Sequence, residues 1–241
     1  MQPGDMIRKY RIEARLGAGG MGVVYKALDE QLHRTVVLKA IREELAFDAS
    51  TRARFIDEAR IQAKLIHQNI CTLFDAFDEN GKLYLLQEFV DGDTLRDMLA
   101  RNGGPLPVNE ALRIVRDILA GLEHAHEEGV IHRDIKPANI MVDKRGRVKI
   151  MDFGIAKALG ATRLGKTQTG MAIGTLTYMS PEQILGKELD GRSDLYSVGI
   201  LLFELLTVSL PFDDTSNEYE VQKFHVEAAV PSAAERHPDV S

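Results

Sequence analysis

The sequence predicts an α+β fold, with short strands concentrated in the first 90 residues and long helices in the remainder. Residues 10–16 alternate between apolar and polar side chains, as a half-buried strand does. Residues 108–127 instead carry apolar side chains at helical spacing. At 241 residues, the chain is long enough for one large domain or for two smaller lobes with a substantial core.

Composition and charge narrow the class of protein. Hydrophobic residues make up 44% of the chain and charged residues 27%, which is typical of a soluble globular protein. No apolar run approaches the ~20 residues needed to span a bilayer, and residues 1–5 lack a secretory pattern. The net charge is −6, and the basic cluster at residues 8–15 is typical of a solvated strand surface rather than a nucleic-acid site. Cys71 is the only cysteine, which excludes an internal disulfide and fits a reducing cytoplasm.

A glycine-rich stretch follows the first predicted strand. Gly17, Gly19 and Gly22 stand in the pattern G-x-G-x-x-G, and glycine lets backbone N–H groups approach phosphate oxygens without a Cβ in the way. A flexible hairpin turn has the same pattern, and dinucleotide-binding proteins share it. Here a second strand follows at residues 23–27 where a dinucleotide-binding unit needs a helix, and a third strand ends at Lys39.

A helix is expected at residues 51–66, with Ser50 or Thr51 as its N-cap. Glu58 lies within it. Its apolar face is predicted to consist of Phe55, Ile56, Ala59, Ala63 and Ile66.

Three later segments complete the predicted elements. Residues 83–90 are typical of a buried strand, which Asp91-Gly92 ends. Asp194 is expected to open a helix at residues 195–207 that is apolar nearly all round and therefore central. A short helix is expected at residues 217–227.

Polar side chains that could carry chemistry gather in His132–Asn139, and behind it in Asp152-Phe153-Gly154. The apolar triplets on either side of residues 143–146 predict a hairpin, which would return Asp152 to the neighbourhood of Asn139. Their carboxylate and amide oxygens suit a hard cation such as Mg²⁺. Asp134 would then be left to receive a hydroxyl proton.

The order H-R-D-x-x-x-x-N followed by D-F-G resembles the catalytic core of the protein kinase superfamily, and Lys136, in D-x-K-P-x-N, resembles its serine/threonine members. The stretch Lys-Thr-Gln-Thr-Gly at residues 166–170 is similar to the activation segment of bacterial eukaryotic-like serine/threonine kinases. The resemblance implies a bilobal protein-kinase-like fold. Residues 10–90 would form an N-lobe with an antiparallel sheet and one helix, and residues 91–241 a mainly helical C-lobe lacking its last helices.

The resemblance further implies ATP-dependent phosphorylation of serine and threonine in proteins, including autophosphorylation, with Mg²⁺ or alternatively Mn²⁺. Asp134 would orient and deprotonate the acceptor hydroxyl, and Lys136 would stabilise the transferring phosphoryl group. Asn139 would act with them as a catalytic residue and, with Asp152, would hold the metal. Asp194 would brace the backbone of the catalytic loop.

Nucleotide binding is implied for a defined set of residues. Glu58 would pair with Lys39, whose ammonium contacts the α- and β-phosphates. Backbone groups at Glu88 and Val90 would hydrogen-bond the adenine edge. The side chains expected to sandwich the ring are Val24, Val37 and Met141. The full implied set is Leu16, Gly17, Gly19, Gly22, Val24, Val37, Lys39, Glu58, Glu88, Val90, Met141 and Asp152.

Residues 155–178 are rich in Thr and Gly and are expected to form an activation segment that ends at Ser180-Pro181-Glu182 and docks peptide. Thr167 and Thr169 are the expected phosphosites. Arg133 would hold the added phosphate, because a phosphothreonine carries about −1.5 to −2 charges. Thr175 is expected to contact Asp134 and Lys136 instead.

Two glutamines depart from the family pattern. Gln87 stands where an apolar residue usually guards the back of the ATP pocket, and Gln62 stands where an apolar residue follows Glu58 by four positions. A buried amide without a partner costs ~1–3 kcal/mol. We therefore expect the two amides to hydrogen-bond each other, the alternative being that each points elsewhere or meets water. Val208 also replaces the usual glycine after Leu-Leu-Thr.

Three other interpretations agree less well with the sequence. A metal site at His124, His126 and His132 is disfavoured because no cysteine or carboxylate set stands at ligand spacing, and His132 is expected to pack near Phe153. A nucleotide-binding pseudokinase scaffold is the alternative to a kinase, although no catalytic residue is missing. A small-molecule phosphotransferase is disfavoured by the peptide-docking segment.

The resemblance also bears on the setting of the protein. Protein substrates are expected as partners, together with a back-to-back dimer or one that exchanges activation segments, without nucleic acid or membrane contact by this segment. The location is expected to be cytoplasmic, as part of a longer, membrane-anchored protein. A kinase C-lobe normally continues beyond Ser241 and supplies an arginine for Glu182, and leaving a buried carboxylate unpaired costs on the order of 3–5 kcal/mol.

Overall fold

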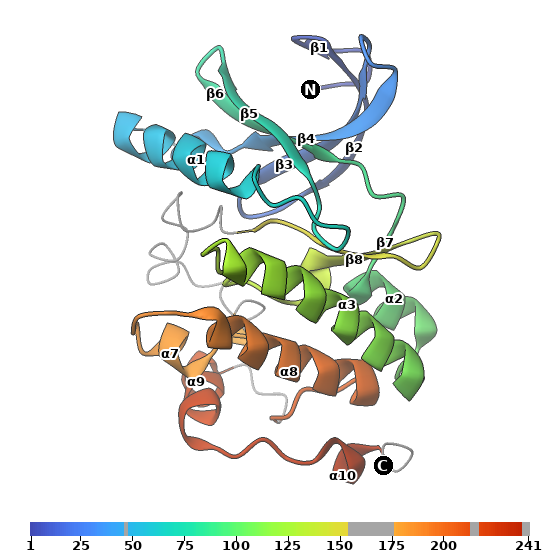
Figure 1. The fold of residues 1–241 in the computed structure, drawn as a ribbon, viewed down its shortest axis with the longest axis vertical. Helices are drawn as coiled ribbons and strands as arrows, with labels where there is room; N and C mark the ends of the chain where they lie inside the picture. Colours follow the sequence, from blue (N-terminus) through green and yellow to red (C-terminus); the bar gives the residue numbers. More distant parts are fainter. Residues whose placement is uncertain (46–47, 154–175, 213–216, 238–241) are drawn as a thin grey trace. The chain divides into compact units, whose positions relative to one another are not determined.

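The computed structural model describes residues 1–45, 48–153, 176–212 and 217–237 (Figure 1). The chain divides into two compact units. Among the described residues, unit 1 comprises those of Met1–His67 and Cys71–Val90, and unit 2 comprises Gln68–Ile70, Asp91–Phe153 and those of Gln168–Ser241. None of the described helices is long and apolar enough to cross a membrane.

Unit 1 is built on a six-stranded sheet in the order β1-β2-β3-β4-β6-β5, and every neighbouring pair is antiparallel. The strand predictions at residues 10–16, 23–27 and 83–90 are confirmed in position, although the last strand ends two residues earlier, at Glu88. The first and fifth strands were not predicted. The strands are β1 (Met6–Ile7), β2 (Tyr10–Ala18), β3 (Gly22–Asp29), β4 (Arg34–Ile41), β5 (Leu73–Glu79) and β6 (Lys82–Glu88).

The two faces of this sheet carry different apolar clusters, because successive side chains of a strand point to opposite faces. One face is rich in aromatic rings, and Phe77 stacks between Tyr10 and Tyr84. The other face packs against Phe55 and Ala59 of the helix α1 (Ala49–Gln62). Its strand residues are Ile41, Leu73, Leu83 and Leu85. A 3₁₀ turn, η1 (Glu43–Leu45), lies between β4 and α1.

The bounds of α1 differ from the prediction at both ends. Its N-cap is Asp48, whose carboxylate accepts the backbone N–H of Thr51 at 2.8 Å and the hydroxyl of Ser50 at 2.6 Å. Ser50 and Thr51, the expected N-caps, therefore donate hydrogen bonds to Asp48, which is the actual N-cap. A carboxylate accepts such bonds more strongly than a hydroxyl does. The helix ends at Gln62, and Ile66 beyond it is 77% exposed. Gln62, not Ile66, completes the buried face.

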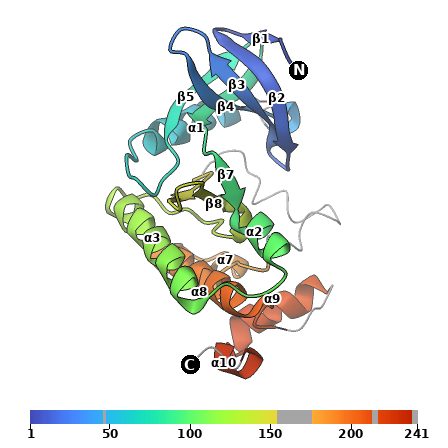
Figure 2. The same cartoon turned by 90° about the vertical axis from the view of Figure 1, so that its right-hand side faces the viewer.

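Unit 2 is mainly helical. The prediction for residues 108–127 is confirmed at both ends by α3 (Val108–Glu127), which lies beside α8 (Gly191–Thr207) in both views (Figures 1 and 2). Not all of its apolar side chains face the core, since Leu112 and Leu119 are exposed whereas Ile114 is buried. The remaining helices are α2 (Leu95–Asn102), α7 (Pro181–Ile184), α9 (Glu218–Glu227) and α10 (Ala233–Arg236).

The helix α8 begins four residues before the expected position, at Gly191 instead of Leu195. Its N-cap is Asp190, so Asp194 lies within the first turn. Leu195 is exposed, but most of the other apolar side chains are buried, as expected of a central helix. At its end Val208 itself adopts the left-handed conformation, with φ 55°, and its N–H donates to the Glu204 carbonyl at 2.8 Å. The turn thus keeps the form that glycine usually provides, at a steric cost to a β-branched residue.

A small antiparallel sheet completes unit 2, in the order β7-β8-β9. The predicted hairpin is confirmed by β8 (Ile140–Asp143) and β9 (Val148–Ile150), which follow a 3₁₀ turn, η2 (Pro137–Asn139). Gly92, expected to end a strand, instead begins β7 (Gly92–Thr94). A Cβ there would lie 2.1 Å from the Val142 carbonyl oxygen, so only glycine allows β7 to pair with β8.

Candidate active site

The carboxylate of Asp194 holds the backbone of the loop that carries the predicted catalytic residues. This carboxylate is 1% exposed and accepts the backbone N–H groups of His132 at 2.9 Å and of Arg133 at 2.8 Å. His126 Nε2 lies 2.8 Å from the same carboxylate. Burial alone would raise the pKa of Asp194, but these hydrogen bonds and the nearby imidazoles outweigh it and hold the pKa below its usual value. Asp194 therefore braces the loop as a charged group.

Three predicted catalytic side chains meet in this loop. The Lys136 ammonium contacts the Asp134 carboxylate at 2.8 Å. The Asn139 amide nitrogen donates to the Asp134 carbonyl at 2.7 Å and to its carboxylate at 2.9 Å. Asp134 is thereby fixed in orientation and remains half-buried. Arg133, immediately before it, has a φ of 70°, so the backbone is strained where the loop turns.

The β8–β9 hairpin returns the chain to the start of the loop. Ile140 is opposite Ile150, and the N–H of Met151 donates to the Asn139 carbonyl at 2.8 Å. Asp152, the next residue, has a φ of 55°. His132 Nε2 lies 2.7 Å from the Met151 carbonyl, and its ring packs on Phe153 with the centroids 4.6 Å apart. The predicted packing of His132 is confirmed, and Asp152 follows directly on the residue bonded to Asn139.

In unit 1, the glycine-rich stretch forms the turn between β2 and β3. Gly19 and Gly22 exchange backbone hydrogen bonds, with the Gly19 N–H donating at 2.9 Å. A Cβ on Gly22 would lie 2.0 Å from the Ala40 carbonyl oxygen, so this glycine is required by the sheet itself. A Cβ on Gly17 or Gly19 would meet nothing within 4 Å. Packing within the described residues therefore gives these two positions no steric reason to be glycine.

The remaining predicted nucleotide residues of unit 1 lie on its strands or just beyond them. Leu16 is half exposed at the end of β2, Val24 is half-buried in β3, and Val37 is buried in β4. The N–H of Glu88 donates to the Thr72 carbonyl at 2.9 Å, and the Glu88 carbonyl is itself in contact with a side chain. Cys71 Sγ lies 3.6 Å from that carbonyl. Val90 is buried at the end of unit 1, and Met141 lies in β8 of unit 2.

The expected ion pair between Lys39 and Glu58 is not formed. Lys39 is buried in β4, with its Nζ 3.8 Å from Met21 Sδ. Glu58 is half-buried and makes no ion pair within the described residues. The position of α1 is set elsewhere, by burial of Phe55 and by contacts of Arg52.

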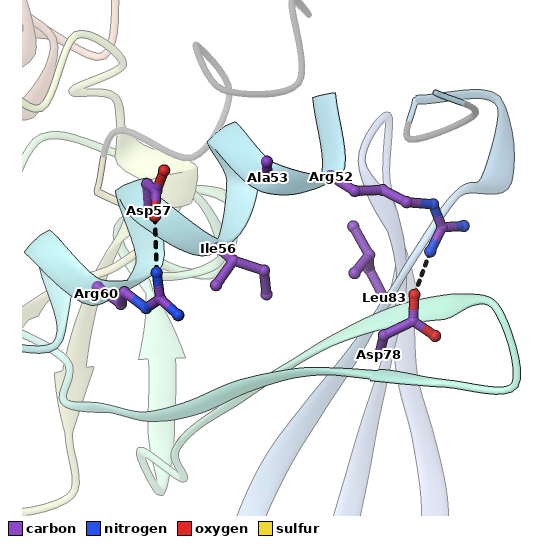
Figure 3. A pocket seen from close by; sticks show the side chains of 7 residues that line it. All are labelled: Arg52, Ala53, Ile56, Asp57, Arg60, Asp78 and Leu83. Atoms are coloured by element: carbon purple, nitrogen blue, oxygen red, sulfur yellow. Dashed lines mark hydrogen bonds and ion pairs between the residues drawn. The ribbon is translucent and has the colours of Figure 1, made fainter. Parts of the chain in front are cut away.

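A shallow pocket of about 340 Å³ lies between α1 and the β5–β6 hairpin (Figure 3). Arg52, on the first turns of α1, contacts both the Asp78 carboxylate and the Gly81 carbonyl of the β5–β6 hairpin. Arg60, two turns further on, pairs with Asp57 of the same helix at 2.8 Å. The apolar floor consists of Ala53, Ile56 and Leu83. None of the predicted nucleotide-binding residues lines this pocket. Its lining residues belong to the contact by which α1 is attached to the sheet.

The expected hydrogen bond between Gln62 and Gln87 is also not formed. Both side chains are buried, at 3% and 2% exposure. Neither polar atom of the Gln62 amide, nor the Gln87 amide nitrogen, has a hydrogen-bond partner within the described residues. Gln62 is the last residue of α1, and Gln87 lies in β6, while α1 is held against the sheet by Phe55 and Ala59. Apolar packing has here prevailed over amide pairing.

The segment at Ser180-Pro181-Glu182 forms a capped helical turn against the catalytic loop. Ser180 and Gln183 make a capping box, and the Gln183 amide donates to the Arg133 carbonyl at 2.8 Å. Glu182 is only half-buried and accepts the Ser193 hydroxyl at 2.5 Å. The expectation of a buried carboxylate without a partner was therefore wrong, because α8 provides a donor. Thr167, Thr169 and Thr175 lie outside the described residues.

Several contacts in this region were not foreseen, because they join residues far apart in the sequence. The Tyr178 hydroxyl donates to the Glu204 carboxylate at 2.5 Å, and the Ser197 hydroxyl donates to the Tyr178 carbonyl at 2.6 Å. Burial raises the pKa of Glu204, although the tyrosine hydrogen bond opposes this. In the sequence, the only signal that points to Tyr178 is the pattern Gly-Thr-x-x-Tyr at residues 174–178, which resembles the family. Arg192 pairs with Asp190, the N-cap of α8, at 2.7 Å.

Comparison with known proteins identifies this arrangement. Residues 10–239 match the family model described as the protein kinase domain. The chain belongs to the protein kinase domain family. It is 43% identical over 243 residues to the serine/threonine-protein kinase PknB of Mycolicibacterium smegmatis, covering 99% of this chain and 39% of that protein. It is 46% identical over 215 residues to the probable serine/threonine-protein kinase SCO3848 of Streptomyces coelicolor, covering 88% of this chain and 32% of that protein.

Solved structures agree with this assignment. The kinase domain of PknI from Mycobacterium tuberculosis superposes with a TM-score of 0.76 at 28% identity, covering all of this chain and 85% of that one. The predicted bilobal kinase fold and the resemblance to bacterial eukaryotic-like kinases are therefore confirmed. The relatives cited above are bacterial proteins named as serine/threonine-protein kinases. This chain spans less than half the length of those curated relatives.

Proposed function

We propose that this kinase domain transfers the terminal phosphoryl group of ATP to serine and threonine hydroxyls of proteins, its own activation segment included. The observation that carries the proposal is the set of contacts around Asp134. Lys136 and Asn139 hold its carboxylate at 2.8 and 2.9 Å, and Asp194 fixes the backbone before it. Such a carboxylate can orient an acceptor hydroxyl and take its proton, while the Lys136 ammonium stabilises negative charge on the transferring group.

The residues proposed to hold a divalent cation are Asn139 and Asp152. The Asn139 amide nitrogen is engaged with Asp134, so its oxygen is the atom that it can present. An amide oxygen and a carboxylate form the donor set that Mg²⁺ prefers, and Mn²⁺ accepts the same ligands. When bound, the cation would neutralise charge on the phosphates of ATP.

The residues proposed to hold ATP are those that the family resemblance implies. Gly17 and Gly19 have open space where a side chain would stand, which suits backbone contact with phosphate. Lys39 is proposed to contact the α- and β-phosphates, with Glu58 pairing to it when nucleotide is bound. The carbonyl of Glu88 and the N–H of Val90 are proposed for the adenine edge. The proposed apolar contacts are Leu16, Val24, Val37 and Met141.

Thr167 and Thr169 are the proposed phosphosites. Arg133 supports this, because its buried Nε has no hydrogen-bond partner within the described residues. A phosphate would provide a charge-assisted partner for that guanidinium. Protein substrates are the proposed partners, and the proposed location is the cytoplasm, as part of a longer, membrane-anchored protein. A back-to-back or segment-exchanged dimer belongs to the same proposal.

Incubation with radiolabelled ATP and Mg²⁺ tests the assignment. The wild-type chain should label itself, and mass spectrometry should place phosphate on Thr167 or Thr169. Asp134→Asn should lose transfer by a factor of ~10³ or more while nucleotide affinity stays unchanged, because only proton acceptance is removed. Asp97→Asn, on the exposed side of α2, is the matched control and should behave as wild type. Retained autophosphorylation in Asp134→Asn would refute the role of Asp134.

A further inference from the structure

The exposed side of α3 carries apolar side chains near its middle. Leu119 is 38% exposed there, and Leu195 of the neighbouring helix α8 is 48% exposed. Both line a shallow groove of about 720 Å³, to which Ala120 also contributes. We call it the α3 groove. Two exposed leucines that share one groove would gain free energy if a partner covered them.

The charged side chains of the α3 groove stand on either side of this apolar centre. Arg116 lies one turn before Leu119, and Glu123 lies one turn after it. The Arg116 side chain is 77% exposed, and its one ion pair within the described residues is a 4.0 Å contact with Asp117. Glu123 is exposed and forms no ion pair in the described part of the chain. Glu127 adds a second negative charge at the same end. The two ends of the groove therefore offer opposite charges to a partner.

The spacing of these charges makes the α3 groove complementary to itself. Residues 116, 119, 120 and 123 share one face of the helix, because the last three follow the first by three, four and seven positions. Arg116 and Glu123 lie about 5 Å along the helix axis on either side of the midpoint between residues 119 and 120. A two-fold axis through that midpoint would place a second α3 antiparallel to the first. Arg116 of each copy would then face Glu123 of the partner subunit, at two equivalent contacts.

Other partners match the groove less well. A second α3 in the parallel direction would set Arg116 against Arg116 of the partner subunit, and like charges that face each other repel. A protein of unrelated sequence would need an acid, an apolar residue and a base at the same spacing in the reverse order. A second copy of this chain provides that order by symmetry alone.

We propose that the α3 groove is the interface of a two-fold symmetric dimer of this chain, with Leu119 and Leu195 at its centre and two ion pairs between Arg116 and Glu123 of opposite copies. The interface belongs to unit 2 alone and is additional to the dimers named above. None of the residues proposed for catalysis or for ATP binding lines the groove, so the proposal does not depend on the proposed activity. The leucines provide most of the affinity, and the charges decide the partner and its orientation.

Sedimentation velocity of the chain over a range of concentrations tests this. The wild type should dimerise with a Kd on the order of 10–100 µM, as expected of a small interface. Arg116→Glu and Glu123→Arg should each raise that Kd at least about tenfold, because each places like charges opposite one another at both contacts. The double variant exchanges the two charges and should return the Kd to within about threefold of the wild type. Arg96→Glu, at an exposed position of α2, makes the same change of charge as Arg116→Glu and should match the wild type.

Mixing the two single variants distinguishes this symmetric interface from any other. Each variant repels itself, but an equimolar mixture of Arg116→Glu and Glu123→Arg should form a heterodimer, because both contacts then join opposite charges. A wild-type chain that stays monomeric at about 1 mM would overturn the proposal, and this is the result expected if another segment of the chain or a different protein occupies the groove. A mixture that stays monomeric would overturn it too. So would single variants that dimerise as well as the wild type.

Discussion

The carboxylate of Asp194 accepts the backbone N–H of Arg133 at 2.8 Å, although the two residues are separated by 61 positions in the sequence. The same carboxylate holds His132 and His126. The residue before Asp134 is therefore positioned by a side chain from another helix. Because the backbone at Arg133 is in the left-handed region, it needs such an external anchor to keep its conformation.

Replacing Asp194 should show the size of this anchor. Asp194→Ala leaves two backbone N–H groups and His126 buried without their acceptor, so the free energy of unfolding should fall by about 3–5 kcal/mol. Urea unfolding followed by circular dichroism measures this. Asp190→Asn is the matched control, because asparagine caps a helix as well as aspartate does and should change little. A loss below 1 kcal/mol in Asp194→Ala would contradict the anchoring role.

The pH dependence of stability should follow from the same carboxylate. The pKa of Asp194 is lower in the folded protein than its ordinary value of 3.8, because its hydrogen bonds outweigh the effect of burial. The unfolded state therefore binds the proton more readily. The stabilisation by Asp194 should be fully present above that ordinary value and be lost as the pH falls through the lower, folded pKa. Asp194→Asn should show a flatter loss of stability over this acid range than the wild type.

Two glycines of one motif should behave differently on substitution. Gly22→Ala places a Cβ 2.0 Å from the Ala40 carbonyl oxygen, so β3 and β4 must separate and the free energy of unfolding should fall by about 2–4 kcal/mol. Gly19→Ala meets nothing within 4 Å and should leave stability within about 0.5 kcal/mol of wild type. Its affinity for ATP should fall instead. Thermal unfolding and nucleotide titration of both variants separate the two roles, and a stability loss in Gly19→Ala would contradict this division.

Gln62 should be a destabilising residue. Both polar atoms of its amide are buried without partners, so Gln62→Leu should raise the free energy of unfolding by about 1–3 kcal/mol. The exposed Gln68→Leu is the control and should have no effect on stability. Chemical denaturation of the two variants measures the difference. If Gln62→Leu were less stable than the wild type, the amide would have a hydrogen-bond partner in solution.

Val208 holds the end of α8 in a conformation that disfavours it. Its φ of 55° is costly for a β-branched side chain, and its side chain is exposed. Val208→Gly should therefore raise the free energy of unfolding by about 1 kcal/mol. This net gain is the strain that the substitution relieves minus the cost of the greater conformational entropy that glycine has in the unfolded chain. Val230→Gly, at another exposed valine, should not stabilise. Equal effects in both variants would show that no strain was stored at the turn.

What the sequence alone determined is local. Helix α3 was placed at both ends because twenty residues share one period, and the β8–β9 hairpin because its turn and strands are adjacent in the chain. The catalytic-loop residues Asp134, Lys136 and Asn139 lie within six positions, so their meeting required little more than a loop. The interactions within α3, within the hairpin and within this loop all join residues that are close together in the sequence.

Only the tertiary structure decided which distant groups would be partners. Asp48 caps α1 in place of Ser50 or Thr51, Ser193 satisfies Glu182, and Gln62 does not reach Gln87. A hydrogen bond contributes about 1 kcal/mol net, whereas burying one large apolar side chain contributes about 1.5–3 kcal/mol. The apolar contacts of Phe55 and Ala59 therefore set the position of α1 first. Its polar side chains then have only the partners that this packing brings within reach.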